Sequence, residues 1–146
     1  MSLRARAVDV ADYILLRLGP TSAMKLQKLV YYSQAWSLAW TDAPLFAEEI
    51  EAWSDGPVVR SLYNKHRGRY RLPRRFFDGE TERLNPDQRD VIERVLKFYG
   101  PKDPQWLSNL THIEEPWKNA RVGLQAGERG HNIIPKEAML NYYANL

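Results

Sequence analysis

One segment, residues 21–40, limits most strongly how this chain can fold. It begins with Thr21-Ser22, whose hydroxyl groups can accept hydrogen bonds from the free N–H groups at the start of a helix. Apolar side chains then continue to Trp40 and fall on most sides of a helix instead of forming one stripe. A helix of this composition is normally surrounded by other elements. The segment therefore predicts a mainly α fold in which this helix is the core of a bundle.

Capping residues and apolar periodicity mark the other helices. Residues 8–18 carry apolar side chains at spacings of three and four, and Gly19-Pro20 ends the pattern. Residues 85–99 and 103–110 each begin with a capping side chain and then proline, which is favoured at the first helical position. Together these signals predict about seven helices, starting near residues 8, 22, 57, 86, 104, 116 and 135.

The pattern changes between the second and third helices. Side chains from Phe46 to Trp53 do not fit a helical period, so a short β-hairpin is expected near residues 46–54. Asp55-Gly56-Pro57 is interpreted as a turn that also starts the next helix. A long connection is expected at 68–85, where glycine and proline recur. Because 146 residues is the length of one domain, the chain is predicted to form a single compact helical domain over residues 1–146.

Composition excludes several classes of protein. The chain has no cysteine, which excludes disulfide frameworks, thiolate catalysis and cysteine-based zinc or iron–sulfur sites. Its five tryptophans and eight tyrosines are typical of a folded core and not of a disordered segment. No window is apolar enough to span a membrane, and no signal-peptide pattern occurs at the start. We expect a cytoplasmic protein that makes no membrane contact.

The net charge of +3 has its origin in one stretch. Residues 60–75 contain seven basic and no acidic residues, which leaves 14 basic against 18 acidic residues in the rest of the chain. Aromatic side chains lie among these cations. Three interpretations are open: a solvated or internally paired loop, a protein interface, or a nucleic-acid-binding surface. The candidate partner-binding residues are Arg60, Arg67, Arg69, Tyr70, Arg71, Arg74, Arg75, Phe76 and Phe77.

Two other groups of residues could carry function. His112 and Glu114 could form an acid–base pair or part of a metal site, or they could bond backbone groups at a helix junction. No second histidine lies at the helical offset that a metal site needs, which favours the junction. The tryptophans, Trp36, Trp40 and Trp106 among them, could line a ligand pocket but are more typical of a core. Since no phosphate-binding loop or nucleophile elbow occurs either, we predict no catalytic residue, metal or cofactor.

Four blocks, taken in order, resemble a known family. They are residues 25–32 (Lys-Leu-Gln-Lys-Leu-Val-Tyr-Tyr), 49–53 (Glu-Ile-Glu-Ala-Trp), 56–59 (Gly-Pro-Val-Val) and 111–117 (Thr-His-Ile-Glu-Glu-Pro-Trp). In combination they are similar to the Panacea domain of SocA-like antitoxins and GepA-like phage-associated proteins. The family-motif positions are Lys25, Gln27, Lys28, Tyr31, Tyr32, Trp53, Gly56, Pro57, Thr111, His112, Glu114, Pro116 and Trp117.

The resemblance implies an antitoxin of a toxin–antitoxin system. Such a protein would neutralise a cognate toxin by direct protein–protein binding, and one branch of the family would pass its toxin to a Clp-type protease. No catalytic residue is implied. The motif positions are expected to be core or junction residues, so the partner surface lies elsewhere, and the Arg-rich stretch is the candidate. A nucleic-acid-binding module using residues 60–77 is the alternative function.

Overall fold

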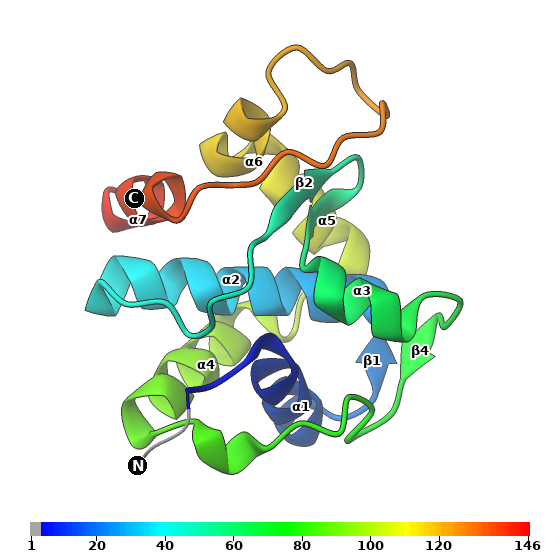
Figure 1. Cartoon of the computed structure of the whole chain (residues 1–146). Coiled ribbons are helices and arrows are strands. Elements are labelled where there is room, and N and C mark those ends of the chain that lie inside the picture. Colours follow the sequence, from blue (N-terminus) through cyan, green and yellow to red (C-terminus); the bar gives the residue numbers. More distant parts are fainter. Residues whose placement is uncertain (1–3) are drawn as a thin grey trace.

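The computed structural model describes residues 4–146, and these form seven α-helices and two small two-stranded sheets (Figure 1). The predicted mainly α fold is confirmed. The elements are α1 (Ala7–Leu18), β1 (Thr21–Ser22), α2 (Ala23–Thr41), β2 (Glu51–Trp53), β3 (Gly56–Val58), α3 (Arg60–His66), β4 (Arg71–Leu72), the 3-10 helix η1 (Thr81–Arg83), α4 (Pro86–Tyr99), α5 (Pro104–Ile113), α6 (Glu115–Ala120) and α7 (Lys136–Ala144).

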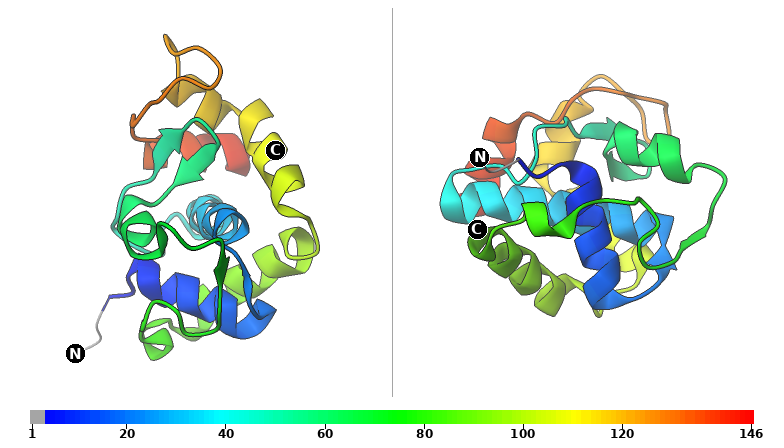
Figure 2. Two further views of the ribbon diagram at one scale, coloured as in Figure 1. Left: turned by 90° about the vertical axis from the view of Figure 1, so that its right-hand side faces the viewer. Right: turned by 60° about the horizontal axis from the view of Figure 1, so that its bottom comes forward.

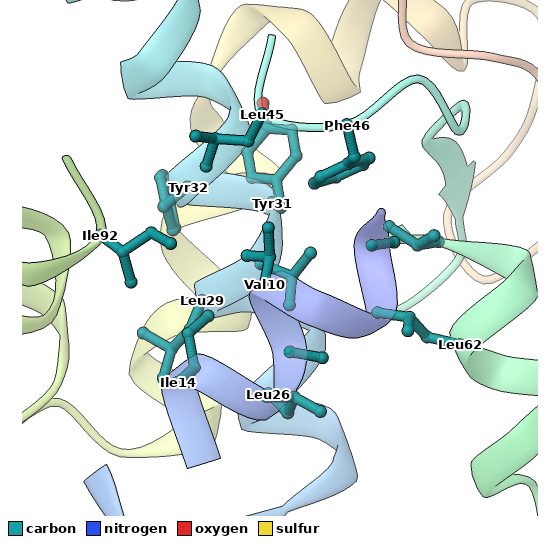
Figure 3. Close-up of a cluster of buried hydrophobic side chains, with 14 of the residues drawn as sticks. Val10, Ile14, Leu26, Leu29, Tyr31, Tyr32, Leu45, Phe46, Leu62 and Ile92 are labelled. Carbon is teal, nitrogen blue, oxygen red and sulfur yellow. The ribbon is translucent and has the colours of Figure 1, made fainter. Parts of the chain in front are cut away.

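Helix α2 runs through the centre of the molecule. The left view of Figure 2 shows it end-on, with the other elements arranged around it. Ser22 caps it as predicted, since its Oγ accepts a hydrogen bond from the backbone N–H of Lys25 at 3.1 Å. Leu26 and Leu29 are completely buried, and Figure 3 shows them beside Ile14 of α1. Truncation of such a leucine to alanine costs about 2–5 kcal/mol, so α2 anchors the core.

Helices α4 and α5 both begin at the capping residues that the sequence predicts. Asn85 accepts a hydrogen bond from the N–H of Gln88 at 2.8 Å, and Asp103 accepts one from the N–H of Trp106 at 2.7 Å. Each helix then begins with the proline that follows its cap. These features are local, which explains why the sequence was sufficient to locate them.

The predicted hairpin is present, but it extends further along the chain, and the predicted helix start at Pro57 was wrong. The strands are β2 and β3, paired antiparallel with Ala52 opposite Pro57, so Gly56-Pro57 lies in a strand. The reason is a distant side chain. Gln27 Oε1 accepts from the N–H of Val59 at 2.9 Å, and its Nε2 donates to the carbonyl of the same residue at 3.2 Å. This pair of bonds holds the backbone extended until α3 begins at Arg60.

The long connection between α3 and α4 is tied to the rest of the fold. Strand β4 pairs with β1, placing Leu72 opposite Thr21. Further along, the carboxylate of Asp12 accepts from the backbone N–H groups of Phe77 and Gly79 at 3.0 and 2.6 Å. Within residues 4–146 no helix is long and apolar enough to cross a membrane.

Candidate functional site

Three of the four motif blocks meet around Lys28 of α2. Gly56 admits this lysine, because a Cβ added at position 56 would lie 2.4 Å from Lys28 Cε and 3.2 Å from Thr111 Oγ1. The backbone of Gly56 also has φ +129°, which side chains with a Cβ rarely adopt. The motif glycine and the motif lysine are therefore a matched pair.

Lys28 is a buried cation. It is 2% exposed, and none of the ion pairs among residues 4–146 involves it. Burial lowers the pKa of its amine to about 8, and the negative charge of Asp55 opposes this only in part. A charged group buried without a counter-ion destabilises the fold, and in a cleft it is a candidate for function.

Replacing Lys28 with methionine is expected to remove this cost. Below pH 8 the lysine is charged in both the folded and unfolded states, so the native chain bears the full penalty. As pH rises from 8 to 10.5 the folded state loses the proton first, and the penalty disappears. Relative to Lys28→Met, the free energy of unfolding of the native chain should rise by about 3 kcal/mol over this interval. Urea denaturation of both proteins across the interval measures it, and a constant difference would contradict it.

His112 and Glu114 of the fourth block do not form an acid–base pair. His112 stacks on Trp117, with ring centroids 4.2 Å apart, and burial lowers the pKa of its imidazole. Trp117 Nε1 donates to the carbonyl of Trp53 at 2.8 Å and so fixes α6 to the hairpin. Among residues 4–146 no hydrogen bond joins His112 to Glu114, and no group of three or more metal-ligating residues occurs.

Glu114 instead organises a network of tyrosines beneath the surface. Its Oε1 accepts hydrogen bonds from the hydroxyls of Tyr32 and Tyr143, both at 2.7 Å. Burial raises the pKa of the Glu114 carboxyl, and these two hydrogen bonds oppose the increase. Because the Tyr143 proton points to Glu114, the hydroxyl oxygen of Tyr143 accepts a second hydrogen bond from the Tyr31 hydroxyl at 2.9 Å. The network connects α2, the junction of α5 and α6, and α7.

An open groove with aromatic walls lies over this network. Its volume is about 650 Å³, within the range of ligand and peptide pockets. Tyr99, which stacks on Tyr32 with centroids 4.1 Å apart, connects the groove to the tyrosine network below. We call it the aromatic groove, and its lining residues are Trp36, Trp40, Arg94, Val95, Phe98, Tyr99, Trp106, Leu110, Ile113, Glu114, Tyr142 and Leu146.

The assignment of the groove tryptophans to the core was wrong in part. Trp40 is 44% exposed and Trp106 is 39% exposed, and beside them Phe98 is 57% exposed. Trp36 is half-buried, and its Nε1 donates to the Tyr99 hydroxyl at 2.9 Å. Large apolar side chains that stay exposed side by side in one concave surface are typical of an interaction site. The signal available in the sequence was the closeness of Phe98 and Tyr99, at the end of α4, to Trp106 in the first turn of α5.

Cations border the groove. The guanidinium of Arg94 lies 5.4 Å from the ring of Trp40, and the amine of Lys102 lies 4.8 Å from the ring of Trp106. Arg94 also forms a 3.4 Å ion pair with Asp90, in which both side chains are mostly exposed. Exposed pairs of this kind are weak, so Arg94 can exchange its partner for another carboxylate.

Some side chains of the Arg-rich stretch bond to or pack against the rest of the fold, and others are exposed. Arg60 forms a 2.8 Å ion pair with Glu51, and the guanidinium of Arg71 donates to the carbonyl of Pro20 at 3.2 Å. Phe77 is buried in the core, so its assignment to a partner surface was wrong. Phe76 is partly buried, and Arg69 lies over its ring at 5.0 Å. The remaining candidates are exposed: Arg67, Tyr70, Arg74 and Arg75.

Comparison with models of known protein families identifies the family of this chain. The family model described as antitoxin SocA-like, Panacea domain matches residues 26–118, nearly two thirds of the chain. This span includes nearly all of the four motif blocks and most of the residues that line the aromatic groove. No curated protein and no solved structure matches the chain.

Proposed function

Because the chain belongs to the antitoxin SocA-like Panacea family, we propose that it neutralises a toxin by direct protein–protein binding, without catalysis. The observation that carries the proposal furthest is the aromatic groove. Large aromatic side chains are the residues on which protein interfaces most depend, and here several stay exposed in one concave surface.

The groove indicates what part of a toxin it would accept. Its walls suit large apolar side chains, and its border presents Arg94 and Lys102. An amphipathic segment with aromatic or aliphatic anchors and nearby carboxylates fits both properties. On this account the toxin covers Trp40, Phe98 and Trp106 and removes them from water.

Co-expression tests the proposed function. The candidate toxin is the product of the neighbouring reading frame, expressed alone and together with this chain. We expect growth arrest in the first case and restored growth in the second. A neighbour that is not toxic, or that stays toxic in the presence of this chain, would overturn the proposal.

Neutralisation can follow from sequestration or from delivery of the bound toxin to a Clp-type protease. A host strain without that protease separates the two. Sequestration persists in this strain, and the amount of toxin is unchanged. If neutralisation depends on delivery to the protease, it fails in this strain, so the toxin accumulates and arrests growth again.

The exposed arginines are proposed to steer the toxin toward this chain. Reversing the charge with Arg74→Glu and Arg75→Glu should slow association about tenfold and leave dissociation nearly unchanged, because long-range attraction acts mainly on the association rate. Stopped-flow or surface-plasmon measurements at low and high salt provide the rates, and high salt should remove the difference. Unchanged association with the toxin, together with loss of DNA or RNA binding, would instead favour the nucleic-acid interpretation.

A further inference from the structure

A second cleft lies away from the aromatic groove, between the hairpin, α3 and the segment before α7. It has an inner lobe of about 230 Å³ and an outer lobe of about 300 Å³. Trp53, Ser54 and Tyr63 line both lobes, so the two adjoin each other at these residues. The rings of Trp53 and Tyr63 stand 4.7 Å apart at an interplanar angle of 65°.

The outer lobe is lined by two cations, Arg67 and Arg129, together with His131, and by no acidic residue. The carboxylate of Glu51 lies beside this lobe, 3.5 Å from His131 Nδ1, and it already accepts hydrogen bonds from Arg60 at 2.8 Å and from Trp53 Nε1 at 2.9 Å. Neither Arg67 nor Arg129 forms an ion pair with another of residues 4–146, and two such guanidinium groups in a small concave surface suit a phosphate or another compact oxyanion.

The inner lobe has a different character. Its walls are mostly apolar and aromatic, and its polar groups include Lys28, Gln27 and Asp55. The Lys28 amine is a buried donor with no ion-pair partner, whereas the exposed Asp55 offers an acceptor. The side-chain amide of Gln27 is already hydrogen-bonded, to the backbone of Val59 and to the ring of His66, whose Nε2 lies 3.0 Å from Gln27 Nε2. A flat ring with both donor and acceptor groups on its edge matches this arrangement.

We propose that the cleft binds a nucleoside monophosphate, with the base in the inner lobe beside Lys28 and the phosphate in the outer lobe on Arg67 and Arg129. The order of the lobes matches the order of groups in such a ligand. Binding of a base would also give the buried Lys28 amine a hydrogen-bond partner, because an acceptor atom on the ring of the base would accept from it. It is independent of toxin binding, because the cleft shares no lining residue with the aromatic groove.

Calorimetric titration of the full chain tests the proposal, with AMP, adenosine and ribose 5-phosphate as probes. We expect AMP to bind at least about tenfold more tightly than either fragment, because it alone occupies both lobes. The double variant Arg67→Gln and Arg129→Gln should reduce the affinity for AMP to that for adenosine. Lys28→Met should weaken both AMP and adenosine about tenfold and leave ribose 5-phosphate unaffected.

Matched variants control for charge. Arg74→Gln with Arg75→Gln makes the same charge change outside the cleft, as does Lys65→Met for Lys28→Met, and neither should alter the affinity for AMP. Thermal melting establishes that each variant is folded. Absence of AMP binding at millimolar concentration, equal affinities for AMP and adenosine, or an unchanged affinity in folded Lys28→Met would each overturn the proposal.

Discussion

Replacing Phe98 and Trp106 with aspartate is expected to weaken toxin binding by at least about 100-fold while the fold remains intact. Both rings are substantially exposed in the free protein, so their removal leaves no cavity in the core. In a complex the same rings would be covered, and central aromatic residues of interfaces each contribute about 2 kcal/mol or more. The introduced carboxylates would also repel the acidic groups that the groove border is expected to attract.

The measurement is the dissociation constant for the toxin, with growth rescue as the readout in cells. Leu16→Asp with Val122→Asp is the matched control, since both residues are exposed and lie outside the groove. The control should bind like the native chain. An unchanged affinity in the groove variant, or an equal loss in the control, would contradict the assignment of the groove as the toxin site.

Replacing Gly56 with alanine is expected to reduce the free energy of unfolding by about 3 kcal/mol. Two effects combine: the backbone conformation at φ +129° is strained for a residue with a Cβ, and the new methyl group strikes Lys28 Cε. Gly68→Ala separates them, because Gly68 has φ +85° but no atom lies within 4 Å of the position that a Cβ would take there. That variant should lose only about 1 kcal/mol, the cost of strain alone.

A double-mutant cycle identifies the collision partner. In a Lys28→Ala background the Cε atom is absent, so Gly56→Ala should cost about 2 kcal/mol less than it does in the native chain. Urea denaturation of the four proteins measures the coupling. Equal costs in the two backgrounds would show that Lys28 and Gly56 are not a matched pair.

The sequence predicted those parts of the fold that depend on neighbouring residues. Helices α2, α4 and α5 begin where Ser22, Asn85 and Asp103 cap them, because a cap acts within three residues of itself. The second strand of the hairpin was taken for a helix start because Gly56-Pro57 is equally compatible with both. Gln27, more than 30 positions away, decides between the two through its bonds to Val59.

The sites were harder to predict because they are formed by residues that lie far apart in the sequence. The resemblance identified Lys28, Gly56 and Thr111, but only the fold brings them into contact. Trp36 and Trp40 lie one helical turn apart on α2, yet the first is half-buried and the second is exposed, because the neighbouring helices cover α2 unevenly. Likewise, no sequence pattern relates Arg67 to Arg129, which share one cleft in the folded chain.

Hydrogen exchange of the chain with and without bound toxin shows whether the toxin covers the aromatic groove, since it locates the interface without mutation. We expect the toxin to slow exchange in the C-terminal half of α4 and in α5, the segments that carry Phe98 and Trp106. Exchange in α1, on which no groove residue lies, should stay the same. Slowed exchange confined to other segments, with α4 and α5 unchanged in a complex that still neutralises the toxin, would contradict this expectation.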